Sequence, residues 1–86
     1  MLEPPKKLRN LFQFRDAIHY IVRTHGDPEL KKLGFALQEV DLPDNIRVRL
    51  AEEAVKILTE KYGFEVDEKL KEKLKKAPIP PVLLPP

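Results

Sequence analysis

The chain has 86 residues, with 16 Lys and Arg against 14 Asp and Glu, and it contains no cysteine. A chain of this length buries only about 60–65% of the surface that it exposes when unfolded, so it supports one hydrophobic core and one domain. The absence of cysteine excludes disulfides, thiolate nucleophiles and cysteine-ligated zinc. The apolar stretches are far shorter than the roughly 20 residues of a membrane span, and no signal peptide is recognisable. We therefore expect a cytoplasmic protein with no membrane partner.

The first helix is predicted between Pro4-Pro5 and Gly26. Apolar side chains recur there at steps of three and four residues, which places them on one helical face. They are Leu11, Phe14, Ile18, Ile21 and His25, flanked by Leu8, Phe12 and Val22. Gly26 supplies the positive φ that commonly follows a helix, so we expect the helix to end near Thr24.

The second helix is predicted over about 28–40. Asp27 is a suitable N-cap, Pro28 suits the first helical position, and Glu29 complements the helix dipole. The inward stripe consists of Leu30, Leu33, Leu37 and Val40. Phe35 lies about 200° away from Leu33 around the helix, so we expect it to point outward.

The third and fourth helices are predicted over about 43–62 and 67–77. The third has an apolar arc of about 200°, broad enough to contact more than one neighbour, so it should be the central helix. The arc comprises Ile46, Val48, Leu50, Ala51, Ala54, Val55, Ile57, Leu58 and Tyr62. The fourth begins at a cap, Asp67, and has a narrow apolar edge of Leu70, Leu74 and Ala77, so we expect it to be the least buried helix.

These segments together predict an all-α fold, a small single-domain bundle of about four helices over residues 1–77. Residues 78–86 form a different segment, because five of these nine residues are proline and the others are apolar. Proline favours an extended, polyproline-like chain. Three interpretations remain open: the tail covers the bundle, the sequence ends within a linker, or the tail is a docking peptide. In the last case its contact residues are Ile79, Val82, Leu83 and Leu84.

Residues that carry catalytic or metal-binding chemistry are sparse. His19 and His25 lie about 240° apart on one helix, so they cannot share a metal ion. Asp41, Asp44 and Asp67 are better explained as helix caps than as ligands. The three glycines are isolated and form no phosphate-binding loop, and no pair of carboxylates lies in an apolar stripe. We therefore predict a protein without cofactor, metal or enzymatic activity.

The leading functional hypothesis is a non-enzymatic module that binds another protein, such as an accessory or adaptor subunit, through Phe35 and the proline-rich tail. The alternative is a small nucleic-acid-binding domain whose basic side chains contact phosphates. Its candidate residues are Lys6, Lys7, Arg9, Lys69, Lys73 and Lys76. The sequence defines no oligomeric state. Its abundance of Lys and Glu is also typical of thermophile proteins.

Overall fold

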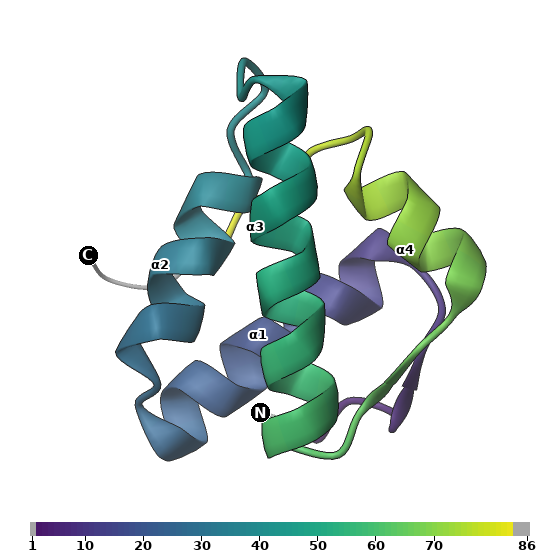
Figure 1. Cartoon of the computed structure of the whole chain (residues 1–86). Coiled ribbons are helices and arrows are strands. Elements are labelled where there is room, and N and C mark those ends of the chain that lie inside the picture. Colours follow the sequence, from purple (N-terminus) through teal and green to yellow (C-terminus); the bar gives the residue numbers. More distant parts are fainter. Residues whose placement is uncertain (1, 84–86) are drawn as a thin grey trace.

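Four α-helices and one short pair of strands make up the computed structural model, which describes residues 2–83 (Figure 1). The helices are α1 (Leu11–His25), α2 (Pro28–Leu37), α3 (Asp44–Lys56) and α4 (Glu68–Leu74). A π-helical turn, η1 (Ile57–Lys61), continues α3. The strands are β1 (Lys7–Leu8) and β2 (Glu65–Val66). The predicted all-α class and the four helices are confirmed.

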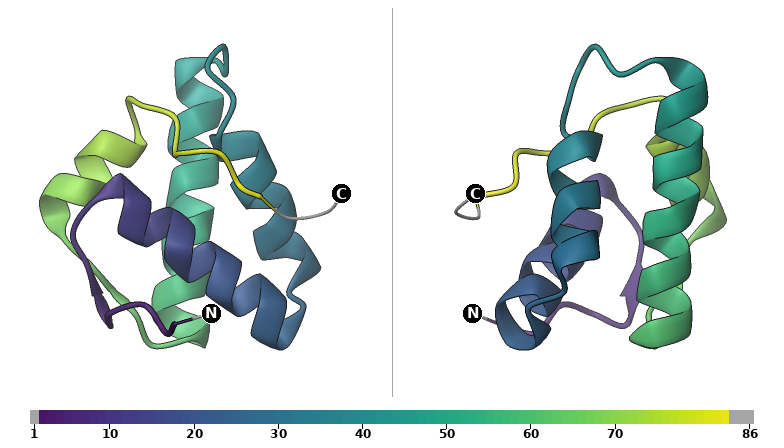
Figure 2. Two further views of the ribbon diagram at one scale, coloured as in Figure 1. Left: turned by 180° about the vertical axis from the view of Figure 1, so that it is seen from behind. Right: turned by 60° about the vertical axis from the view of Figure 1, so that its left-hand side comes forward.

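The continuous helix formed by α3 and η1 lies between α2 and α4, and α1 crosses behind it (Figures 1 and 2). Its contacts with both α2 and α4 agree with the central position expected from its broad apolar arc. Small side chains, Ala51 and Ala54, are buried where the helices approach one another, and Leu58 is completely buried. This helix is therefore the central helix of the core.

The first helix begins later than predicted, at Leu11 and not directly after Pro4-Pro5. The preceding segment is occupied by β1, which pairs in parallel with β2 and joins Lys7 to Glu65 in register. Helix α1 starts only after Asn10, whose side chain accepts a hydrogen bond from the backbone N–H of Gln13 at 2.9 Å. The prediction missed the strand because its partner lies 58 residues further along the chain.

The second helix ends at Leu37, three residues earlier than predicted, and Val40 is 75% exposed where we expected it in the core. Beyond the helix end, the guanidinium group of the buried Arg47 donates hydrogen bonds to the carbonyl oxygens of Glu39 at 2.6 Å and Val40 at 3.2 Å. A cationic donor that reaches carbonyls left open at a helix end stabilises that end. Arg47 thus fixes the turn between α2 and α3.

Other helix details differ from the sequence prediction at single residues. Helix α4 ends at Leu74, and it is not a weakly buried edge, because Leu70 and Leu74 are both fully buried. Phe35 is partly buried and packs against the core, since α2 contacts both α1 and α3 and leaves few free faces. Phe12, expected beside the apolar face of α1, is 62% exposed.

The predicted caps are partly confirmed. Asp27 and Asp67 cap α2 and α4 by accepting hydrogen bonds from the backbone N–H groups of Leu30 and Lys69. Helix α3 instead has Pro43 at its N-cap with no side-chain hydrogen bond, and Asp44 is its first residue, so the cap predicted at that helix start is wrong. Gly26 follows α1 with a φ of 65°, as expected.

Candidate interaction surface

The C-terminal tail lies across the bundle between α1 and α2 (Figure 2). The side chains of Ile79 and Val82 are buried and belong to the same apolar cluster as the helices. The backbone N–H of Ile79 donates to the carbonyl oxygen of Leu37 at 3.0 Å, and that of Val82 donates to Gln38 Oε1 at 2.7 Å. Two of the predicted partner-contact residues therefore pack on their own bundle, whereas Leu84 lies outside the described residues.

The outer end of the tail is attached to α1. Arg15 Nη1 donates a hydrogen bond to the carbonyl oxygen of Pro81 at 3.2 Å, and the backbone N–H of Leu83 donates to His19 Nε2 at 2.9 Å. The guanidinium carbon of Arg15 also lies 5.6 Å from the centre of the Phe12 ring. These contacts connect one exposed face of α1 to the end of the tail.

Three large apolar side chains are exposed along this face. Leu2 is 93% exposed, Phe12 is 62% exposed and Leu83 is 75% exposed. Leu2 borders a shallow hollow of about 370 Å³, shared with Pro4, Pro5, Glu3, Asp16 and His19, and His19 in turn binds the backbone of Leu83. We call Leu2, Phe12 and Leu83 the α1 patch. Its members come from the N-terminal segment, from α1 and from the tail.

The imidazole of His19 is neutral where it accepts the Leu83 hydrogen bond, because the accepting Nε2 atom cannot carry a proton. Burial of the ring, together with the positive charges of Arg15 and Arg23, lowers its pKa below the ordinary value, although Asp16 partly opposes this. Both the geometry and the charges around His19 favour the neutral ring. The sequence analysis had considered His19 only as a possible metal ligand.

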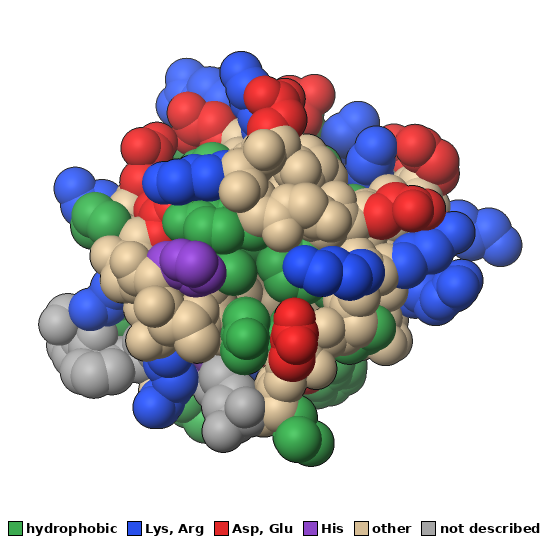
Figure 3. All heavy atoms as spheres, turned by 90° about the horizontal axis from the view of Figure 1, so that it is seen from below, with side chains coloured by type: hydrophobic (Ala, Val, Ile, Leu, Met, Phe, Trp, Pro, Cys, Tyr) green, Lys and Arg blue, Asp and Glu red, His purple; other side chains and the backbone are tan. Residues whose placement is uncertain are grey.

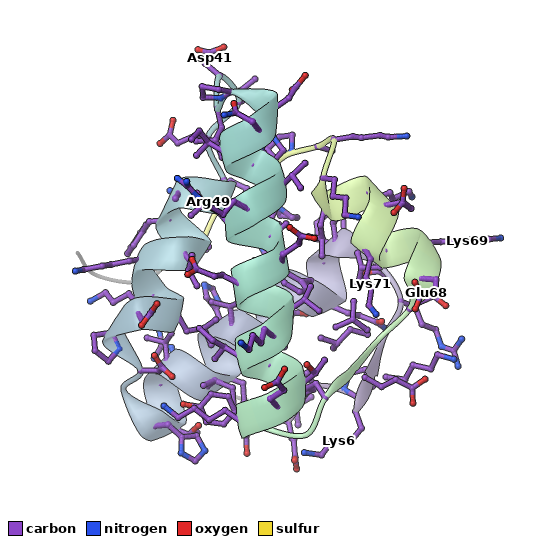
Figure 4. All side chains as sticks on the ribbon, in the orientation of Figure 1. Lys6, Asp41, Arg49, Glu68, Lys69 and Lys71 are labelled. Carbon is purple, nitrogen blue, oxygen red and sulfur yellow. The ribbon has the colours of Figure 1, made fainter. Side chains whose placement is uncertain are left out.

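The predicted phosphate-binding residues do not form one site. Lys7 pairs with Glu65 at 3.4 Å, and Lys6 Nζ lies 4.8 Å from the centre of the Phe64 ring. Lys69 points outward beside α4, far from Lys6 at the lower end of the molecule (Figure 4). The face seen in Figure 3 mixes acidic, basic and hydrophobic side chains.

The exposed lysines of α4 are the most coherent basic group. Lys69, Lys73 and Lys76 are exposed and follow helical spacing, which places them on one side of α4 and the turn after it. Lys71 and Lys75, by contrast, form ion pairs with Glu68 at 3.2 Å and Glu72 at 3.4 Å. Arg9 is also exposed, but it belongs to the segment that precedes α1.

A partly buried polar cluster joins the start of α2 to the end of η1. Asp27 Oδ2 accepts hydrogen bonds from the hydroxyl of Tyr62 at 2.6 Å and from Lys61 Nζ at 3.2 Å, while Oδ1 caps α2. Burial alone would raise the pKa of Asp27, but the hydrogen bonds from Tyr62, Leu30 and Lys61 outweigh it and lower the pKa. The ring of His25 lies 5.0 Å from that of Tyr62. The sequence indicated the cap but not this connection between two helices.

Arg47 is the second buried polar residue, and the sequence analysis missed it. It occupies the buried stripe of α3 at the same three- and four-residue spacing as its apolar neighbours. A charged residue within such a stripe was the signal that could have identified it. Its role is to bind backbone carbonyls, as described above.

Within residues 2–83, no group of three His, Cys, Asp or Glu side chains is arranged to hold a metal ion. None of the helices in this range is long and apolar enough to cross a membrane. Comparison of the chain with protein-family models, curated proteins and solved structures gave no match.

Proposed function

We propose that this protein is a non-enzymatic, cytoplasmic interaction module that binds another protein through the α1 patch. The observation that carries the proposal is the exposure of Leu2, Phe12 and Leu83 around the part of α1 that holds Arg15, Asp16 and His19, in a very small domain. Large apolar side chains that gather on the surface of a soluble domain typically mark a site of protein contact. Aromatic side chains such as Phe12 are also enriched in protein interfaces.

The hydrogen bonds around the patch support this proposal. Arg15 and His19 attach the end of the tail to α1, so the Leu83 side chain is presented from a bound backbone. A surface that is ordered before binding loses less entropy on association. Phe35 contributes less than the sequence suggested, because it is partly buried against the core.

Affinity capture from lysate of the source organism tests the proposal with a matched control. The variant F12S/L83S removes two apolar side chains of the patch but retains the Leu83 backbone N–H. The control V40S removes an apolar side chain that is equally exposed, at 75%, in the turn after α2. We expect the patch variant to lose specific partners that wild type and V40S retain, with similar melting temperatures for all three. Identical partner sets for both variants would contradict the proposal.

A second candidate function is the binding of nucleic-acid phosphates by Lys69, Lys73 and Lys76. The observation in its favour is that all three are exposed on one side of α4, whereas Lys71 and Lys75 are paired with acids. The triple variant K69Q/K73Q/K76Q should reduce the salt dependence of DNA or RNA binding by about one counterion per lysine. The control K71Q/K75Q should change it much less. Wild-type protein that shows no salt-dependent binding would exclude this function.

A further inference from the structure

The tail binds between α1 and α2 in the manner of a bound peptide. Within residues 78–83, the prolines have no backbone N–H, so only Ile79, Val82 and Leu83 can donate a backbone hydrogen bond. Each of these three N–H groups donates to the bundle: to Leu37 O, Gln38 Oε1 and His19 Nε2 respectively. Arg15 supplies the complementary donor for one tail carbonyl, that of Pro81. The surface thus matches the hydrogen-bonding groups of an extended proline-containing segment.

The same surface buries two apolar side chains of the segment that are three residues apart. The side chains of Ile79 and Val82 are buried, whereas Pro81 and Leu83 remain exposed. Extended peptides are commonly recognised in this way, by backbone hydrogen bonds together with pockets for some of the side chains. We call the surface formed by Arg15, Ile18, His19, Gly34, Leu37 and Gln38 the tail groove.

Gly34 lies in the floor of the tail groove. A Cβ atom added there would lie 3.1 Å from Ile18 Cγ2, which is a tight contact, and 3.6 Å from Val82 Cγ2, which is an ordinary van der Waals contact. Glycine inside a helix costs about 1 kcal/mol relative to alanine. Its presence within α2 is explained by the close approach of Ile18 on α1.

We propose that the tail groove is a recognition site for extended, proline-containing apolar segments, and that its occupant in trans is the tail of a second copy of this chain. A second copy carries the identical segment and can make every contact described above. The segment follows α4 after a short turn over residues 75–77, in which the backbone N–H groups bond the carbonyl oxygens of Glu72 and Lys73. Exchange requires that these hydrogen bonds open, so that the extended turn can reach another molecule. Reciprocal exchange of one such element closes a two-fold dimer.

The protein concentration determines whether the tail binds its own chain or a second copy. A tethered segment experiences an effective concentration of about 1 mM, so the chain's own tail occupies the groove in dilute solution. Exchange between molecules becomes favourable as the protein concentration approaches that value. This inference does not rest on the α1 patch, because its apolar contacts are made by the buried side chains Ile79 and Val82 and not by the exposed side chain of Leu83.

The first experiment uses the full chain with V82D, which places a charge in the apolar seat and displaces the chain's own tail. A labelled peptide of residues 77–86 is titrated and followed by fluorescence anisotropy. We expect it to bind V82D at least about tenfold more tightly than wild type, because the intact tail of wild type competes. The control L83D carries the same new charge one position away on an exposed side chain and should behave like wild type.

A control peptide with Val82 replaced by Asp should not bind V82D. Equal binding of both peptides, or equal binding to V82D and wild type, would overturn the proposal. If V82D alone is unfolded, addition of the wild-type peptide must restore its helical circular dichroism, and a failure to do so also overturns it.

The second experiment measures dimer formation by sedimentation equilibrium between about 10 µM and about 1 mM of the full chain. Wild type and L83D should show a dimer fraction that rises with concentration, and V82D should not. Wild type that stays monomeric over this range, or V82D that dimerises to the same extent, would refute tail exchange.

Discussion

The contact between Asp27 and Tyr62 leads to the sharpest prediction about stability. The Asp27 side chain is only 5% exposed, and it accepts hydrogen bonds from the Leu30 N–H, the Tyr62 hydroxyl and Lys61 Nζ. An N-cap contributes about 1 kcal/mol, and a hydrogen bond to a charged group contributes about 1.5–3 kcal/mol. Because these contributions are not fully additive, we expect D27A to lower the free energy of unfolding by about 2–4 kcal/mol.

Variants of Tyr62 and Lys61 separate the contributions of these two donors to the stabilisation by Asp27. Y62F removes one hydroxyl and should cost about 1.5–3 kcal/mol, because its loss leaves a buried carboxylate oxygen with one donor fewer. K61M should cost clearly less than Y62F, because the Lys61 side chain is 65% exposed and its ion pair is weakened by solvent. The variant D27N retains an oxygen for the cap and isolates the effect of the charge.

Urea unfolding followed by far-ultraviolet circular dichroism measures these differences. Because the hydrogen bonds lower the pKa of Asp27, the stabilisation is complete above the unfolded-state pKa of about 3.9 and is lost as the pH falls through the lower folded-state value. The difference between wild type and D27N should therefore shrink in strong acid. A cost for K61M equal to that for Y62F, or a D27A protein as stable as wild type, would refute the reasoning.

Three other variants or conditions test the packing and the tail. L58A should lower the free energy of unfolding by about 2–5 kcal/mol, because Leu58 is completely buried, and a loss below about 1 kcal/mol in chemical denaturation would contradict its central position. R47M should cost about 2–3 kcal/mol by leaving carbonyls at the end of α2 without their cationic donor, as measured by the shift of the urea midpoint. Acidification should detach the end of the tail: the pKa of His19 is lowered by burial and by Arg15, so the acceptor for the Leu83 N–H is present above about pH 6.5 and is lost as the pH falls through that lowered pKa. The Leu83 amide resonance in NMR spectra should titrate together with His19, and an amide shift that stays constant while the ring protonates would exclude this coupling.

The sequence alone determined the features that depend on neighbouring residues. The N-cap at Asp27, the helix that follows it, and the left-handed glycine after α1 were all predicted correctly. A cap bonds an N–H group within about three residues, and an apolar stripe repeats every three or four residues, so both signals lie within a short stretch of chain. The all-α class follows from the sum of these local signals.

The contacts between segments that are distant in the sequence were determined only by the tertiary structure. Strand β1 exists because Lys7-Leu8 meets Glu65-Val66, and α1 is shortened as a result. Arg47 is buried because the open carbonyls after α2 lie within its reach, and Asp27 gains Tyr62 as a donor only where η1 meets the α1–α2 turn.

The tail shows the same division. Its proline content predicted an extended segment, and its composition left open whether Ile79 and Val82 would face a partner or the bundle. The structure buries both against the bundle, with Val82 beside Gly34; Gln38 Oε1 accepts the N–H of Val82, and His19 Nε2 accepts the N–H of the next residue, Leu83. Residues that lie about 40 to 65 positions apart in the chain meet in this groove. The periodicity of side chains predicts only the helix or strand in which it occurs, so no local pattern could predict this contact.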